Sequence, residues 1–89
     1  MQSKNLNISM SNLISLSHLQ EGETGIIRSF TNDKMASKLL SMGVLPGKHL
    51  RLIRRVPFGG GLYIKVEDAN IAVRKSEALN IMVEKIHAI

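Results

Sequence analysis

The 89-residue chain contains no cysteine and no tryptophan, and only 3% of its residues are aromatic. The absence of cysteine excludes disulfide bonds, thiol catalysis and cysteine-ligated zinc or iron–sulfur sites, and it permits a reducing cytoplasm. No segment approaches the ~20 apolar residues that a membrane-spanning helix needs, and the N-terminus lacks the features of a signal peptide. We therefore expect a soluble cytoplasmic protein with one core, built from Ile, Leu, Val and Met.

Metal-binding patterns are sparse. Three histidines, His18, His49 and His87, are scattered along the chain, and no spacing places two ligands on one face of a helix. A weak surface site for Fe²⁺ or another divalent metal, formed by His18 with Glu21 or Glu23, is one interpretation. Solvated loop side chains are the default interpretation, and we expect no resident metal or cofactor.

Catalytic patterns are also lacking. The glycines of Phe58–Gly61 suit a phosphate loop only if a Lys-Ser or Lys-Thr pair follows at the start of a helix. Leu62–Glu67 follows instead, and its alternating apolar residues are typical of a strand. The run therefore predicts a hairpin loop. Because no acid–base pair shares an evident cleft, we expect no enzyme and no catalytic residue.

Positive charge is in excess, since 12 Lys and Arg residues oppose 7 Asp and Glu residues and give a formal net charge of +5. This balance suits an acidic partner, whether a nucleic-acid backbone, an anionic lipid or an acidic protein surface. Neighbouring strands could gather one basic cluster, formed by Arg51, Arg54, Arg55, Lys65, Arg74 and Lys75. A plain solvated surface is the alternative. The shortage of aromatic side chains for base stacking makes nucleic acid the less favoured partner.

The hydrophobic pattern predicts a mainly β domain of about five short strands and one short α-helix. The strands are expected at Ile26–Phe30, His49–Val56, Leu62–Glu67, Ile71–Arg74 and Ile81–Glu84. Ile53 interrupts the alternation in its strand and indicates a β-bulge. So many short strands are best closed into a small barrel, because an open sheet leaves unpaired edges. Residues 1–15 show no sustained period and predict a poorly ordered or loosely docked tail, which leaves residues 16–89 as the domain.

The predicted helix begins after a cap at Asn32 or Asp33. Its apolar stripe is formed by Met35, Leu39, Leu40 and Met42. Such a stripe covers the core or, being rich in methionine, forms a flexible docking surface. Core packing is the favoured interpretation.

A sharp corner follows this helix. Gly43 suits the left-handed position just after a helix, Pro46 fixes the first central angle of a turn, and Gly47 accepts the positive φ of a type II turn. The sequence therefore predicts a helix stop and a tight turn before the next strand.

Four ordered segments resemble the FeoA family, and the resemblance covers roughly residues 16–84. They are Leu16 and Leu19 before Gly22–Ile26, then Leu39–Gly47, then Arg54–Gly60, and finally Ile71–Ala78 with Ile81–Val83. The resemblance implies an SH3-like barrel with motif residues Gly25, Met42, Gly43, Pro46 and Gly47. It also implies a cytoplasmic accessory of ferrous iron uptake that associates with FeoB, a membrane protein with a GTPase domain and the iron path, and reaches the membrane only through that partner.

Candidate partner-binding residues are taken from the basic cluster and the hairpin. They are Arg54, Arg55, Phe58, Tyr63 and Arg74. Two alternatives stay open beside the FeoB accessory. One is a small basic nucleic-acid-binding barrel. The other is an SH3-like interaction module of a metal-dependent regulator, because the same barrel occurs at the C-terminal end of repressors of the DtxR type. The oligomeric state is open.

Overall fold

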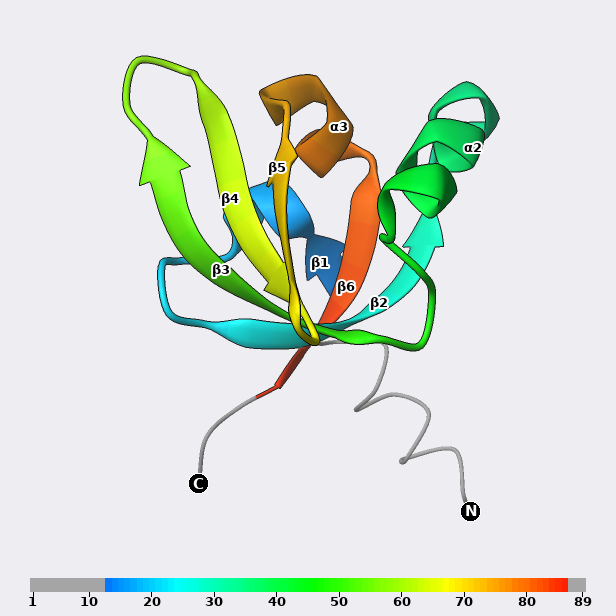
Figure 1. Ribbon diagram of the computed structural model, residues 1–89, viewed down its shortest axis with the longest axis horizontal. Coiled ribbons are helices and arrows are strands. Elements are labelled where there is room, and N and C mark those ends of the chain that lie inside the picture. Colours follow the sequence, from blue (N-terminus) through cyan, green and yellow to red (C-terminus); the bar gives the residue numbers. More distant parts are fainter. Residues whose placement is uncertain (1–12, 87–89) are drawn as a thin grey trace.

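The computed structural model describes residues 13–86. Within this range the chain forms six β-strands, two α-helices and one 3₁₀-helix (Figure 1). In chain order they are β1 (Leu13–Ser15), η1 (Leu16–His18), β2 (Thr24–Phe30), α2 (Asp33–Met42), β3 (His49–Val56), β4 (Gly61–Val66), β5 (Ala69–Val73), α3 (Lys75–Leu79) and β6 (Ile81–Ile86). The predicted mainly β fold is confirmed.

All six strands belong to one antiparallel sheet with the order β1-β6-β2-β3-β4-β5. The sheet curls strongly, so that its two edge strands approach the same side of the molecule (Figure 1). There α3 contacts both β4 and η1, and η1 contacts β6. Helical segments thus fill the side of the barrel where β1 and β5 do not pair with each other.

The core inside the curled sheet is aliphatic, as the composition predicts. Its buried hydrophobic residues are Leu16, Leu19, Ile27, Leu39, Val44, Leu50, Leu52, Leu62, Ile64, Val66, Ile71, Val73, Ala78, Ile81 and Val83. The stripe of α2 contributes buried Leu39 together with partly buried Met35 and Met42, whereas Leu40 is exposed. Core packing of the stripe is therefore confirmed for three of its four residues.

Three short elements, β1, η1 and α3, were not predicted from the sequence. Leu13–Ser15 forms β1 and pairs with β6, so that the sheet begins before residue 16 and has six strands. Residues 1–12 of the expected tail lie outside the described residues. The segment expected as a turn at Ser76–Ala78 is the five-residue helix α3. A strand of three residues and a helix of five residues are too short to show a period in the sequence.

The corner after α2 has the predicted geometry. Gly43 is the left-handed C-cap of α2 with φ 101°, and the N–H of Lys48 donates to the carbonyl of Leu45 at 3.1 Å. Gly47 occupies the turn with φ 93°. Gly25 serves a different need, because a Cβ there would lie 3.0 Å from the carbonyl oxygen of Glu84. A larger residue would push β2 away from β6.

Candidate docking site

A β-bulge in β3 decides which way the basic side chains point. Leu52 pairs with Ile64, but the next pair is Arg54 with Tyr63, so that Ile53 is the extra residue. The bulge that the sequence predicts is confirmed. Its extra residue advances the register by one, and Arg55 is consequently opposite the buried Leu62.

Five exposed side chains form what we call the basic face, on the outer side of β3 and β4: Arg51, Ile53, Arg54, Tyr63 and Lys65. Arg54 is the cross-strand partner of Tyr63, and Arg51 is the partner of Lys65. Ile53 and Tyr63 are each 46% exposed. The face therefore combines three cations with two large side chains that have apolar surface open to solvent.

The cations of the basic face lack neutralising partners among the residues that the structure describes. Within residues 13–86 the salt bridges are Arg28–Glu84, Lys38–Glu77, Lys48–Glu67 and Lys85–Glu23, and none involves Arg51, Arg54 or Lys65. Like charges directly opposite each other on a sheet destabilise it by roughly 0.2–1 kcal/mol, and Arg51 faces Lys65. This arrangement is unfavourable in the free protein and suits an acidic partner.

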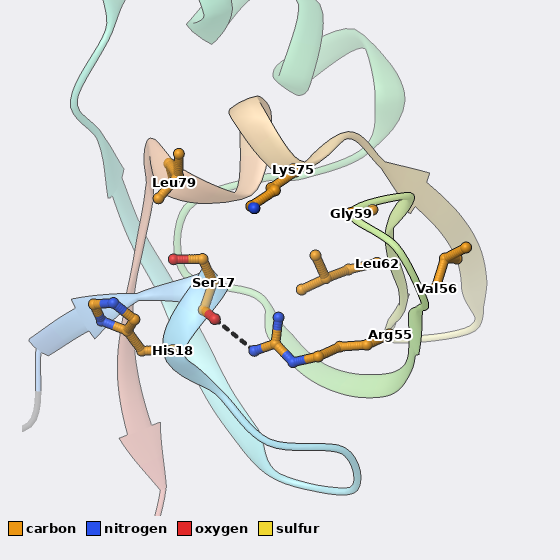
Figure 2. Close-up of a pocket in the computed structure, with 9 residues that line it drawn as sticks. Ser17, His18, Arg55, Val56, Gly59, Leu62, Lys75 and Leu79 are labelled. Atoms are coloured by element: carbon orange, nitrogen blue, oxygen red, sulfur yellow. Dashed lines mark hydrogen bonds between the residues drawn. The ribbon is translucent and has the colours of Figure 1, made fainter.

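Arg55 lies in a pocket instead of on the basic face. The pocket has a volume of about 390 Å³ and lies between η1, α3 and the β3–β4 hairpin (Figure 2). The guanidinium of Arg55 donates to the carbonyls of Ser17 and Leu19, and its backbone N–H donates to Glu21 Oε2 at 2.9 Å. The expectation of one continuous basic cluster is therefore wrong, because the bulge turns Arg55 toward η1.

Phe58 is at the tip of the β3–β4 hairpin and is fully exposed. Its φ of 61° is left-handed, a conformation that costs an ordinary residue roughly 1–2 kcal/mol. The remaining predicted residue, Arg74, is exposed at the N-cap of α3. The structure thus brings Arg54 and Tyr63 together and places Arg55, Phe58 and Arg74 at separate positions.

Helix α3 is held in place by a buried carboxylate. Glu77 is 4% exposed, accepts the backbone N–H of Arg74 at 2.8 Å and forms a salt bridge of 2.6 Å with Nζ of Lys38 in α2. Burial raises the pKa of Glu77, but hydrogen bonds from Lys38 and Arg74 and the charges of both residues lower it, and the net pKa lies below its ordinary value. The charged form therefore links α3 to α2.

Metal binding at the candidate surface site is not supported by its geometry. Glu21 accepts the N–H of Arg55, and Glu23 pairs with Lys85 at 2.8 Å. In the described part of the chain, no three His, Asp or Glu side chains are grouped in a way that could hold a metal ion. Binding of Fe²⁺ with His18 stays an untested prediction.

The sequence did not point to several residues around the pocket. Lys75 and Leu79 line it from α3, and Ser17 lines it from η1. Lys75 was assigned to the basic cluster, and Leu79 and Ser17 carried no functional signal. No helix among the described residues is long and apolar enough to cross a bilayer.

Comparison with known proteins identifies the family. Residues 14–85 match the FeoA domain family model. The chain belongs to the FeoA family. An iron uptake regulatory protein (FeoA) of known crystal structure is 30% identical, with a TM-score of 0.74 over 83% of this chain and 97% of the other. Searching the curated proteins by sequence found no match.

Two further structures show how widely the fold occurs. FeoA of Stenotrophomonas maltophilia, in complex with zinc, is 28% identical, with a TM-score of 0.67 over 79% of this FeoA chain and 88% of its own. That protein is described as a prokaryotic SH3 domain protein with a suggested role as a ferrous iron transport activating factor. A manganese-dependent transcriptional repressor is 21% identical, with a TM-score of 0.75 over 83% and 42% of the two chains. The latter shares the fold alone, and the SH3-like fold of the present chain is confirmed.

Proposed function

We propose that this FeoA protein is a non-enzymatic cytoplasmic accessory of ferrous iron uptake, which docks on a FeoB-like membrane GTPase. The observation that carries the proposal is the basic face, whose three cations form no salt bridge with the described residues and surround the exposed Ile53 and Tyr63. Family membership directs the proposal to iron uptake, and the relative suggested to be a ferrous iron transport activating factor supports the same direction.

The chemistry of the basic face matches that of protein interfaces. Arginine and tyrosine are enriched at interface hot spots, and apolar anchors surrounded by charge provide both affinity and orientation. An acidic surface on the partner would remove the repulsion between Arg51 and Lys65. Docking would act on the GTPase or its channel by differential binding, since a bound protein shifts a conformational equilibrium only by its difference in affinity for the two states.

Affinity capture tests the docking. Tagged protein is incubated with detergent-solubilised membranes at ~150 mM salt, where casual electrostatic binding is largely screened, and half of the sample is treated with nuclease. We expect a FeoB-like GTPase in both halves. Nucleic acid that is captured instead and lost after nuclease treatment would favour the basic nucleic-acid-binding barrel, as would a steep fall of affinity with salt.

A pair of charge-reversal variants assigns the docking to the basic face. Lys65→Glu should reduce recovery of the GTPase by at least about tenfold, because it places a negative charge against an acidic partner. Lys34→Glu is the matched control, since Lys34 is exposed on α2 and forms no salt bridge with the described residues. Equal recovery with both variants would exclude the basic face.

Measurement of ferrous iron uptake in cells tests the accessory function. Cells that depend on ferrous iron should lose uptake when the gene for this protein is deleted, and the wild-type chain should restore it. Unchanged uptake in the deletion strain would overturn the accessory function.

A further inference from the structure

The pocket beside α3 is lined by two cationic side chains, Lys75 and Arg55. Figure 2 shows the ammonium of Lys75 and one amino group of Arg55 directed into the space between α3 and the β3–β4 hairpin. The other amino group of Arg55 donates to the carbonyls of Ser17 and Leu19. Two positive charges therefore face one concave space of about 390 Å³.

Among residues 13–86, no acidic side chain lines this pocket. Glu21 accepts the backbone N–H of Arg55 outside it, and Glu77 of α3 is turned to Lys38. Neither Arg55 nor Lys75 forms a salt bridge with any residue of the range 13–86. Charges of one sign in a concave, partly apolar site raise the local concentration of the opposite ion, so the pocket favours an anion.

The walls of the pocket are apolar. Leu62 is buried at its base, and Val56 and Leu79 also line it. Leu79 is 52% exposed, so that a large aliphatic side chain of the pocket lining is open to solvent. Pockets of this kind, mainly apolar with a few convergent polar groups, are typical of ligand sites in which the polar groups fix orientation.

Arg55 is already ordered for binding. Its hydrogen bonds to two carbonyls fix the guanidinium before any ligand arrives, so that binding loses little side-chain entropy. The bulge at Ile53 is the reason for this placement, because without it Arg55 would share the outer face with Arg51. The bulge therefore places Arg55 in the pocket and separates it from the basic residues of the outer face.

We infer that this pocket binds a carboxylate carried on an apolar stem, presented by a segment of a partner protein in which an Asp or Glu side chain adjoins an apolar residue. The carboxylate lies between Arg55 and Lys75, and the apolar group contacts Leu62 and Leu79. A bare phosphate fits less well, since it leaves the apolar walls uncovered and the N–H of Gly60 is bonded to the carbonyl of Val56 at 3.4 Å. The inference rests on the proposed docking function and adds the chemistry that the partner presents.

Small probes test the chemistry of the pocket. Amide NMR spectra are recorded while 4-methylpentanoate, 4-methylpentanamide or inorganic phosphate is added to the full chain. We expect 4-methylpentanoate to shift the amide signals of Leu62, Lys75 and Leu79. The neutral amide should bind at least about threefold more weakly, which is the loss expected for one partly exposed ion pair. Phosphate should also bind more weakly, because it leaves the apolar walls uncovered. Equal binding of the acid and its amide would overturn the assignment of the two cations.

Variants separate the charged and apolar parts of the site. Lys75→Gln should weaken the binding of 4-methylpentanoate by about threefold to fivefold. Leu79→Ser should weaken the binding of the acid and of the amide to the same extent. Lys34→Gln removes the same charge from α2 at a residue that does not line the pocket, and it should leave binding of both probes unchanged. Signals elsewhere in the spectrum report whether each variant is folded. Unchanged binding in folded Lys75→Gln and Leu79→Ser would overturn the inference.

Peptides identify the source of the carboxylate. A blocked hexapeptide with a central Leu-Glu-Leu sequence should shift the same signals, and its Leu-Gln-Leu counterpart should not. Binding of the free acid without binding of the peptide would refute a protein segment as the ligand. If Lys75→Gln and Leu79→Ser both retain the captured GTPase at the wild-type level, the pocket inference fails while docking through the basic face stands. Loss of capture by the wild-type chain refutes the docking function instead.

Discussion

Replacing Glu77 with glutamine is the most informative test of how the helices are fixed to the barrel. The substitution keeps the shape of the side chain and a carbonyl that can accept the N–H of Arg74, but it removes the charge that faces Lys38. Since Lys38 is 54% exposed, the salt bridge is partly screened, and we expect a loss of about 1–2 kcal/mol in the free energy of unfolding. For a domain of this size that loss lowers Tm by about 5–15 °C.

The pH dependence of this loss follows from the direction of the pKa. Hydrogen bonds from Lys38 and Arg74 hold the folded-state pKa of Glu77 below its ordinary value of 4.5, in spite of burial. A group whose pKa is lowered on folding stabilises the fold above its unfolded pKa, and this stabilisation is lost as the pH falls through the folded pKa. Wild type and Glu77→Gln should therefore differ fully at pH 7, and the difference should shrink as the pH falls below 4.5.

Urea unfolding followed by circular dichroism, at steps between pH 7 and pH 3, measures the loss in the free energy of unfolding and its dependence on pH. Glu67→Gln is the matched control, because Glu67 pairs with Lys48 at 3.4 Å and both side chains are about half exposed. That variant should cost less than about 0.5 kcal/mol. A destabilisation by Glu77→Gln that stays constant from pH 7 to pH 3 would refute the charge-based account, and no destabilisation at any pH would refute the linking role of Glu77.

Three further substitutions probe the turn, the pocket and the basic face. Gly47→Val should destabilise by roughly 1–3 kcal/mol through the positive φ alone, because no atom of the described residues, apart from the two chain neighbours, lies within 4 Å of an added Cβ; an unchanged melting temperature would contradict the turn assignment. Arg55→Gln should cost about 1–2 kcal/mol by leaving the carbonyls of Ser17 in η1 and of Leu19 at its C-cap without their donor, and an unfolding curve equal to that of wild type would show these bonds to be dispensable. Lys65→Glu should raise the free energy of unfolding by about 0.2–1 kcal/mol, since it replaces a like-charged pair with Arg51 by an opposite pair; a lower stability would contradict the repulsion.

The sequence predicted the elements whose chemistry is local. Gly43 and Gly47 have positive φ values in the structure, as the helix stop and the turn require, and Ile53 is the extra residue of a bulge. The alternation of Leu62, Ile64 and Val66 identified the inner face of β4 correctly. Each of these features depends on residues that are close together in the chain.

What the sequence could not predict depends on contacts between distant segments. A bulge is visible as a break in alternation, but the direction of the next side chain is set by the partner strand, so the placement of Arg55 opposite Leu62 was missed. β1 is stabilised by β6, almost 70 residues away in the chain. The pocket is formed by η1, α3 and the β3–β4 hairpin together, and the sequence of any one of these segments alone does not predict it.

Tyr63 offers a direct optical report of docking. It is the only tyrosine of a chain that has no tryptophan, so excitation near the tyrosine absorption band selects a single side chain. That side chain is 46% exposed and lies beside Arg54 in the middle of the basic face. Contact with a partner at this face would change its emission intensity and anisotropy without any attached dye. Because aromatic residues are scarce, Tyr63 serves as a single intrinsic fluorescent probe of the basic face.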